Sequence, residues 1–435
     1  MSVSAFHLPQ EIWVQVFLYL SDHEKGNVRV SCKYFKRLID HPSLWRNSVV
    51  VLKKIRACND EFWTTMRRRK TSSVVVHKAG LKDWEKLAAS LPWLTAIIIE
   101  QCSDLATLET LQRFSNLKRL VIQSFQCPSD LGSVLSPLRQ LTHLTLCELH
   151  SAPRAQLIGA VSQLTSLTSL FYHEGDKPIP RQVFQGMLAS LPNLKQLSLK
   201  MGPVYGTLPD DYFCLPSLNP KIAGREGHGK NHVGLTRLEL LNYMDPMLSA
   251  VALEPLSSLQ SLTVGYRDQA VEPSRCALST WLSKLPSLTE LTVIRGYPLR
   301  VYVCSLPRTL QSLSLLQVIM GPGDMRTMGE RTPDLQHLHM DLCSYGSQSG
   351  LQELPLLLPE LRMLKLRHCN MTEQEFVGLA RLQHLERLVV LDAHPGPSPA
   401  LMEVIQKLQF KTNYRVQVIH SLVPRDPTAC YCSQY

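Results

Sequence analysis

One short pattern of hydrophobic and polar positions recurs through most of the 435-residue chain. A leucine is followed by an apolar residue three positions later and by another two positions after that, as in LTHLTLCEL from Leu141. The apolar residues at positions four and six alternate with mostly polar ones at positions three, five and seven, as a half-buried strand requires. Strands are therefore predicted from Leu94, Leu117, Leu141, Leu167, Leu194, Leu235, Leu259, Leu288, Leu310, Leu335, Leu361 and Leu385.

The copies are evenly spaced, since ten of the eleven intervals between them are 22 to 29 residues long. Each interval leaves room for a segment that returns along the opposite side, so that consecutive strands stack in parallel. The pattern resembles leucine-rich repeats, which carry Asn or Cys at position nine to satisfy the turning backbone. Cysteine stands there as Cys102, Cys343 and Cys369. We expect an α/β solenoid, curved, with parallel strands on the concave side and helices on the convex side.

The return segments are expected to be helical. Thr372 and Glu375 have the spacing of a capping box, and Phe376, Leu379 and Leu382 then supply a buried face. Because proline cannot continue a helix, a recurring Leu-Pro-x-Leu motif marks the point where a helix ends and a strand follows. The motif occurs at Pro92, Pro192, Pro286 and Pro359.

The limits of the array follow from the same register. Thr71 lies one repeat before Leu94 and is expected to open the first strand, and residues 413–420 to hold the last, giving about fourteen strands. The long interval after Leu194 contains a Gly- and Pro-rich insertion, which is expected to leave the solenoid as a loop. The expected domains are residues 1–52, a basic linker over 53–70, a solenoid over 71–420 with the insertion at 203–233, and a tail over 421–435.

The N-terminal 52 residues show helical spacing instead of the repeat. Pro9 is expected to open a helix in which Ile12, Val16, Phe17 and Leu20 share one face. Fewer than about 50 residues make a poor independent core, so a partner is expected to cover part of this apolar surface.

Three clusters in this segment resemble an F-box: Leu8-Pro9 to Val16-Phe17, then Val30 to Lys33, and last Leu44-Trp45-Arg46. The segment before Val28 lacks a leucine that many F-boxes carry. The order of an F-box, a linker and leucine-rich repeats resembles the F-box/leucine-rich-repeat proteins. That resemblance implies binding to a Skp-type adaptor and, through it, to a cullin and a RING subunit. It also implies that nine residues contact the adaptor or hold the box together: Leu8, Pro9, Ile12, Phe17, Leu20, Val30, Cys32, Leu44 and Trp45.

Composition and charge narrow the possible functions. The net charge of +10 lies mostly in residues 1–70, with 13 Lys/Arg against 6 Asp/Glu, whereas the rest holds 33 against 30. Nucleic-acid binding by the repeats is therefore not expected. The run Arg67–Lys70 is a nuclear-import signal, a phosphate-contacting patch or, as we favour, a solvated linker. The twelve cysteines include no CxxC pair, and neither a secretory signal nor a membrane-length apolar run is visible. A cytoplasmic or nuclear location without a membrane contact is expected.

The odd positions of the strands are candidates for binding a protein substrate. Phe171 is a large apolar group where polar residues are usual, and Lys365, Arg367 and Arg387 would suit an acidic or phosphorylated segment. His337 and His339, with Asp341 and His368, make a metal site conceivable, but a recognition surface is favoured. Ordinary solvated sheet residues are the alternative for each of them. The candidates are Arg119, His143, Phe171, His173, Lys200, Arg237, Glu239, His337, His339, Lys365, Arg367 and Arg387.

No motif for catalysis, a metal or a cofactor stands out, so an enzyme is not expected. The favoured hypothesis is a non-catalytic substrate receptor of a Skp–cullin–F-box ubiquitin ligase. The alternatives are an F-box/repeat scaffold that sequesters partners without promoting their degradation, and a repeat protein that acts outside a ligase.

Overall fold

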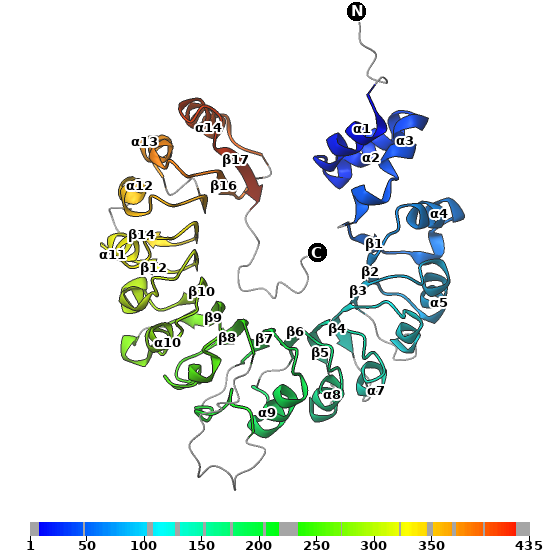
Figure 1. Cartoon of the computed structure of the whole chain (residues 1–435), viewed down its shortest axis with the longest axis horizontal. Coiled ribbons are helices and arrows are strands. Elements are labelled where there is room, and N and C mark those ends of the chain that lie inside the picture. The colour runs from blue at the N-terminus through cyan, green and yellow to red at the C-terminus, as the bar shows by residue number, and fades with distance from the viewer. Residues whose placement is uncertain are drawn as a thin grey trace, which may run out of the picture. The chain divides into compact units, whose positions relative to one another are not determined.

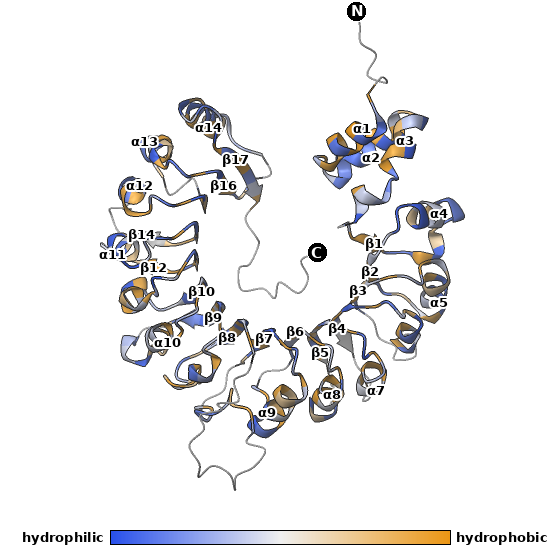
Figure 2. Ribbon diagram, viewed as in Figure 1, coloured by the Kyte–Doolittle hydropathy of each residue, from blue (hydrophilic) through white to orange (hydrophobic). Residues whose placement is uncertain are grey.

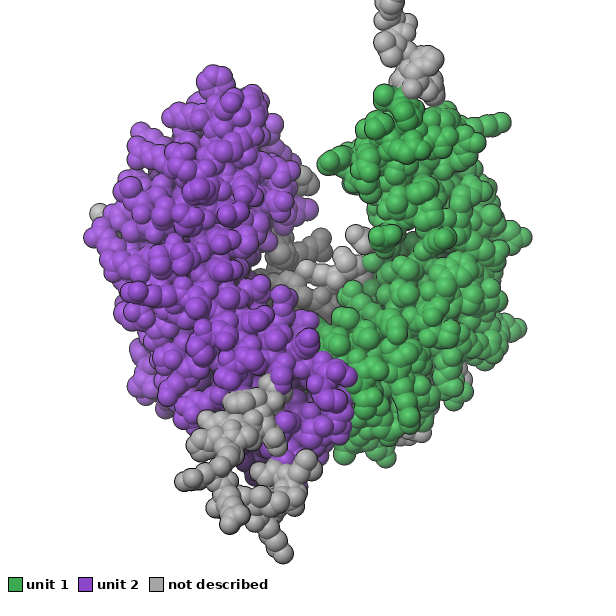
Figure 3. Space-filling view, viewed as in Figure 1, with its two compact units in different colours: residues 1–174, 431–435 green, residues 175–430 purple. Residues whose placement is uncertain are grey.

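The computed structural model forms two compact units, residues 1–174 and residues 175–430 (Figure 3). It describes residues 8–46, 48–101, 108–126, 131–150, 154–174, 177–202, 206–216, 234–270, 272–321, 323–345, 351–367, 371–394 and 396–422. Each unit is treated separately below.

The first unit opens with a small helical domain: α1 (Gln10–Leu18), α2 (Asp22–Ser31), α3 (Lys33–Ile39) and the 3-10 turn η2 (Pro42–Trp45). Pro9 stands at the N-cap of α1, as predicted. Ser21 and Glu24 form a capping box at α2, in which the Ser21 amide donates to Glu24 Oε2 over 2.7 Å. Hydrogen bonds from Ser21 lower the pKa of Glu24.

Parallel strands follow in chain order in the first unit, and helical segments cover one face of their sheet (Figure 1). Among its described residues the strands are β1 (Val50–Leu52), β2 (Ser73–His77), β3 (Ala96–Glu100), β4 (Arg119–Gln126), β5 (His143–His150) and β6 (Ser169–His173). The segments between them are η3 (Ile55–Ala57), α4 (Asp60–Arg68), α5 (Leu81–Ser90), η4 (Thr110–Arg113), α7 (Leu131–Leu135) and α8 (Arg154–Val161).

The second unit repeats this two-layer arrangement. Its described parallel strands are β7 (Gln196–Lys200), β8 (Arg237–Tyr243), β9 (Ser261–Gln269), β10 (Glu290–Gly296), β11 (Ser312–Leu316), β13 (His337–Asp341), β15 (Met363–Arg367), β16 (Arg387–Asp392) and β17 (Gln417–Leu422). A separate short pair joins β12 (Ile319–Met320) to β14 (Ser344–Tyr345). The helical segments are α9 (Arg181–Ser190), η5 (Glu254–Leu256), η6 (Pro273–Arg275), α10 (Leu278–Lys284), η7 (Leu299–Val301), η8 (Val303–Ser305), α11 (Asp324–Arg331), η9 (Leu351–Glu353), α12 (Leu354–Leu357), α13 (Glu373–Gly378), η11 (Leu379–Arg381) and α14 (Pro399–Lys411).

The predicted repeat register is confirmed by the pairing of the strands. Position three pairs with position three, as in Arg119 with His143, and position four with position four, as in Leu120 with Leu144. Both leucines are fully buried between the sheet and the helices. Apolar and polar residues alternate along many of these elements (Figure 2). The leucine pattern therefore supplies one continuous core layer within each unit.

Position eight of the repeat turns the chain out of the strand. Gln101, Ser124, Glu148 and Leu342 all occupy this position and adopt positive φ angles, between 48° and 55°. At position nine, Cys343 Sγ donates a hydrogen bond to the Leu315 carbonyl over 3.3 Å, which is the backbone-satisfying role predicted for it. Cys102 and Cys369 lie outside the described residues.

The capping box at Thr372 is also present, since Glu375 N donates to Thr372 Oγ1 and Thr372 N donates to Glu375 Oε2. Phe376, Leu379 and Leu382 are buried below it, as predicted. Several other return segments are single 3-10 turns instead of α-helices, among them η4 and η5.

The structure differs from the sequence interpretation at two boundaries. The sheet begins one strand early, because β1 pairs in parallel with β2, from Val50–Val74 to Leu52–Val76. Part of the expected insertion is core: Tyr212 and Phe213 are fully buried, and Tyr212 stacks on Phe184 with ring centroids 4.4 Å apart. Aromatic burial holds this segment against α9, so it does not leave the solenoid. Residues 203–205 and 217–233, and the tail from residue 423, lie outside the described residues.

Candidate interaction surfaces

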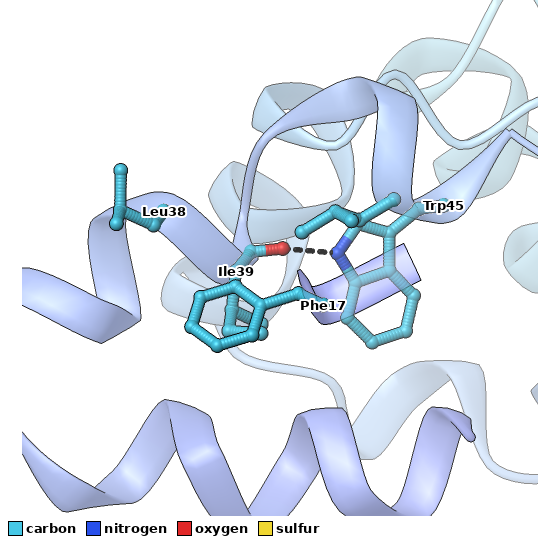
Figure 4. Close-up of a cluster of buried hydrophobic side chains, with 5 residues drawn as sticks. Phe17, Leu38, Ile39 and Trp45 are labelled. Carbon is cyan, nitrogen blue, oxygen red and sulfur yellow. Dashed lines mark hydrogen bonds between the residues drawn. The ribbon is translucent and has the colours of Figure 1, made fainter. Parts of the chain in front are cut away.

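The helical domain has its own compact apolar core. Phe17, Leu38, Ile39, Leu44 and Trp45 are buried together (Figure 4). The Trp45 indole Nε1 donates a hydrogen bond to the Ile39 carbonyl, which fixes η2 against the end of α3. The ring of Phe17 meets that of Phe35 edge-on with centroids 5.5 Å apart, so the aromatic contacts extend from α1 to α3.

Helix α1 carries two apolar faces. Phe17 lies in the core, and Trp13 and Leu20 pack against it. Ile12 and Val16, which the sequence analysis placed on the same face as Phe17, instead point outward and are 46% and 44% exposed. That prediction was wrong because the face of α1 that packs on the core runs through Trp13, Phe17 and Leu20, which leaves Ile12 and Val16 beside it.

Ile12, Val16 and Tyr19 form what we call the outer face of α1, at spacings of four and three residues. Tyr19 is 90% exposed, although it stands among apolar residues at the end of the helix. Leu8, just before the helix, and Val30, at the end of α2, are further exposed apolar residues. A small domain with a complete core and this much exposed apolar surface has the properties of a binding module.

The nine predicted adaptor-site residues thus divide into two groups. Phe17, Leu44 and Trp45 are core residues and Leu20 packs on the core, while Cys32 Sγ accepts the Phe35 amide at the start of α3. The exposed residues, which are available to a partner, are Leu8, Pro9, Ile12 and Val30. Sequence reasoning missed Val16 and Tyr19 as surface residues, although their spacing from Ile12 was the signal that could have found them.

A buried carboxylate ties the helical domain to the first repeat. Asp40, at the end of α3, is fully buried and accepts hydrogen bonds from Arg29 Nε at 3.0 Å and Arg69 Nε at 2.8 Å. Arg68 Nη1 lies 3.6 Å from its second oxygen. A buried carboxylate is retained only when cations compensate its lost hydration. Asp40 therefore requires residues from both α2 and the end of α4.

Arg69 also covers Trp45, with its guanidinium carbon 3.6 Å from the ring centroid. Burial lowers the pKa of Arg69, and the hydrogen bond to Asp40 opposes that shift. The segment expected to be a solvated linker is thus folded: Trp63 and Met66 of α4 are buried, and Arg69 is held in the ion-pair cluster. Within Arg67–Lys70, Arg68 and Arg69 pair with Asp40, and Arg67 Nε donates to the Ser90 carbonyl.

The recognition candidates in the first unit differ in accessibility. Arg119 and His143 are exposed neighbours in register on β4 and β5. Burial and the charge of Arg119 lower the pKa of His143. Phe171 is half-buried, and its ring meets His173 with centroids 6.0 Å apart. His173 is only 2% exposed, so its prediction as a surface residue is wrong; position seven is also buried at Gln123 of β4 and Cys147 of β5.

In the second unit, Lys200 is half-buried and Arg237 is exposed. Glu239 accepts a hydrogen bond from Ser198 Oγ on the neighbouring strand. Arg237 Nη2 lies 3.7 Å from Glu290 Oε1, so opposite charges meet on this part of the face. The exposed pair leaves little net charge to attract a partner.

The remaining candidates lie close together on β13, β15 and β16. His339 pairs in register with Lys365, and His337 and Arg387 are both in register with Met363. Arg367 forms an ion pair with Asp341, whose side chain is 5% exposed. Burial, and secondarily Lys365, lowers the pKa of His339 to about 4, so the ring is neutral at pH 7.

Among the described residues no group of three or more His, Cys, Asp or Glu is arranged to hold a metal ion. His368, the fourth residue of the conceivable metal site, lies outside them. In the described parts of the chain, no helix combines the length and apolar character needed to span a membrane.

Comparison with known proteins supports the division at the N-terminus. Residues 5–50 match the F-box-like family model. No curated protein matches the chain. The chain is 15% identical to an internalin of Listeria monocytogenes, covering 80% of this chain and 86% of that one with a TM-score of 0.35. It is 16% identical to a chain of the Drosophila Toll–Spatzle complex, covering 86% of this chain and 55% of that one with a TM-score of 0.39.

The chain therefore consists of an F-box-like domain followed by a solenoid of parallel strands like that of leucine-rich-repeat proteins. The first part rests on the family match and the second on the strand pairing within each unit.

Proposed function

We propose that the chain is the substrate-recognition subunit of a Skp–cullin–F-box ubiquitin ligase. The F-box-like domain binds a Skp-type adaptor and, through it, a cullin and a RING subunit, while the repeats bind the protein to be ubiquitinated. The chain has no catalytic role in this scheme. It raises the effective concentration of the target near the conjugating enzyme.

The outer face of α1 is the observation that carries this proposal. Ile12, Val16 and Tyr19 are exposed beside a core that is already complete without them. Apolar side chains gathered on one helix face are costly in water unless a partner covers them. We place the function in the cytoplasm or the nucleus, which is supported by the free thiols of the described cysteines, such as Cys32 and Cys343.

The test measures binding of the full chain to a Skp-type adaptor. We expect Ile12→Asp and Tyr19→Asp to weaken binding by at least about tenfold each, because a carboxylate must then be desolvated in an apolar interface. Phe410→Asp is the matched control, since Phe410 is 79% exposed on α14 in the second unit. Equal loss in the control, or unchanged binding in both α1 variants, would overturn the proposal.

Ubiquitination is tested with the same variants in a reconstituted ligase. At a limiting adaptor concentration, Ile12→Asp is expected to slow transfer to a bound target by about the factor by which it weakens adaptor binding, while target binding persists. A point variant is preferable to deleting residues 1–52, because the deletion removes Asp40 and leaves Arg69 without its carboxylate.

A further inference from the structure

The strand face of β13, β15 and β16 holds more cations than anions. Its odd positions hold three cations, Lys365, Arg367 and Arg387, against the single anion Asp341. Asp341 is already paired with Arg367. Among the described residues, neither Lys365 nor Arg387 takes part in an ion pair. The corresponding positions of β9 and β11 hold no charged side chain. They are Ser261, Thr263 and Gly265 on β9, and Ser312, Ser314 and Leu316 on β11.

The two unpaired cations lie close together. Lys365 pairs in register with Val389, and Arg387 is two residues before Val389 on the same face of β16. They are therefore diagonal neighbours on adjoining strands, with the apolar side chains of Met363 and Val389 completing the square. A carboxylate-bearing strand or loop laid across the face would meet a cation on each of two neighbouring strands.

His339 supplies a second, independent indication of a ligand. Its ring lies beside Lys365, and its Nε2 is buried without a hydrogen-bond partner among the described residues. A buried polar atom that remains unpaired costs about 1–3 kcal/mol. Because that atom exposes almost no surface, an anionic oxygen can accept from it only if the neutral imidazole rotates toward the face when the ligand binds.

We propose that this face, which we call the β13–β16 basic face, binds an acidic segment of the target, rich in Asp and Glu. Lys365 and Arg387 contact separate carboxylates, and the His339 ring rotates so that its Nε2–H donates to one of them. The inference rests on the proposed function, because it names the chemistry of the substrate that the repeats receive.

Carboxylates are favoured over a phosphate by the state of Arg367. Phosphate recognition commonly uses several cations that converge on one group, and Arg367 Nε already donates to Asp341. What remains is one ammonium group and one exposed guanidinium on different strands. Two separated charges fit two separated carboxylates better than one compact dianion.

The experiment uses the full chain with its adaptor and three labelled peptides of equal length: one rich in Glu, its Gln counterpart, and one with a single phosphoserine. We expect the Glu peptide to bind, to weaken as salt rises, and to lose about tenfold in affinity with Lys365→Glu or Arg387→Glu. Lys411→Glu, the same charge change on α14 of the helical layer, should alter affinity by less than about twofold.

His339 is tested by a pair of variants. His339→Leu removes the donor and should reduce affinity several-fold, while His339→Gln retains an N–H group and should restore most of it. Equal binding of the Gln peptide, tighter binding of the phosphoserine peptide, or equal loss with Lys411→Glu would overturn the inference. Adaptor binding is measured in parallel. A chain that binds the Glu peptide but not the adaptor refutes the proposed ligase function and leaves this inference standing. A chain that binds the adaptor but not the Glu peptide refutes only this inference.

Discussion

The guanidinium of Arg69 lies 3.6 Å above the ring of Trp45 while its Nε donates to Asp40. Trp45 belongs to the core of the helical domain, and Arg69 directly follows α4 of the first repeat. The same side chain thus joins an aromatic core residue and a buried carboxylate from a different part of the sequence. The F-box-like domain is consequently fixed to the start of the solenoid within the first unit and is not carried on a free linker.

Removing the buried carboxylate should destabilise the first unit strongly. Asp40→Ala leaves Arg29 and Arg69 without their shared partner, so we expect a loss of about 3–5 kcal/mol in the free energy of unfolding. Denaturant unfolding followed by tryptophan fluorescence measures it. Glu61→Gln, which removes the exposed partner of Lys36, is the control and should change the free energy of unfolding far less. Similar losses in both variants would show that the Asp40 cluster is no stronger than a surface ion pair.

Asp245 should make the second unit less stable as pH rises. Burial raises its pKa from 3.8 to about 6, against hydrogen bonds that include one from Tyr243 Oη at 2.7 Å. Because the pKa is higher in the folded state, the protonated carboxyl contributes stability at low pH. That contribution is lost as pH rises from about 4 through about 6, and above that range the free energy of unfolding is lower by about 3 kcal/mol.

Asp245→Asn keeps an oxygen that accepts from Tyr243 and removes the charge. We expect it to raise the unfolding temperature at pH 8 and to have little effect at pH 4. Asp268→Asn, at a mostly exposed carboxylate of β9, is the control and should leave the pH profile unchanged. A wild-type profile that is flat between pH 4 and pH 8 would contradict the prediction.

Gly296 is required at the end of β10 for two reasons. Its φ is +77°, and a Cβ atom there would lie 2.3 Å from Cδ2 of the buried Tyr266 ring. Gly296→Ala should therefore destabilise the second unit by about 1–3 kcal/mol. Gly186→Ala within α9 meets no atom within 4 Å and should instead stabilise by about 0.5–1 kcal/mol. Thermal unfolding of the two variants should shift in opposite directions.

The capping box of α13 gives a smaller expected effect. Thr372→Ala removes the oxygen that accepts the Glu375 amide over 3.3 Å and should cost about 1 kcal/mol in the free energy of unfolding. Thr372→Ser retains that oxygen and should remain close to wild type. Equal destabilisation by both variants would indicate that the threonine methyl group matters more than the cap.

Much of the solenoid was predictable because its information is local and repeated. The leucine of each copy precedes its strand by two residues, as Leu117 precedes β4 at Arg119, and the same residue spacing brings position three of one strand beside position three of the next. The capping box at Thr372 and the turn role of Cys343 were likewise readable from short spacings.

The candidate surfaces were less predictable because exposure depends on segments far apart in sequence. His173 occupies position seven, which alternation alone predicts to face outward, yet it is buried, as are Gln123 and Cys147 at the same position. Arg367 stands among basic residues, yet its Nε donates to Asp341, 26 residues earlier in the sequence. Tyr212 and Phe213 lie in a region that looks like a loop but pack on Phe184.

The sequence by itself determined the repeat, its register and the order of an F-box-like domain and parallel strands, because alternating burial and motif spacing operate within a few residues. Only the tertiary structure decided which apolar face of α1 stays exposed, which cations remain unpaired, and how the first repeat is joined to the box. These outcomes depend on desolvation and ion pairing, such as that of Asp40 with Arg69 across 29 residues, which become defined only when the chain is folded.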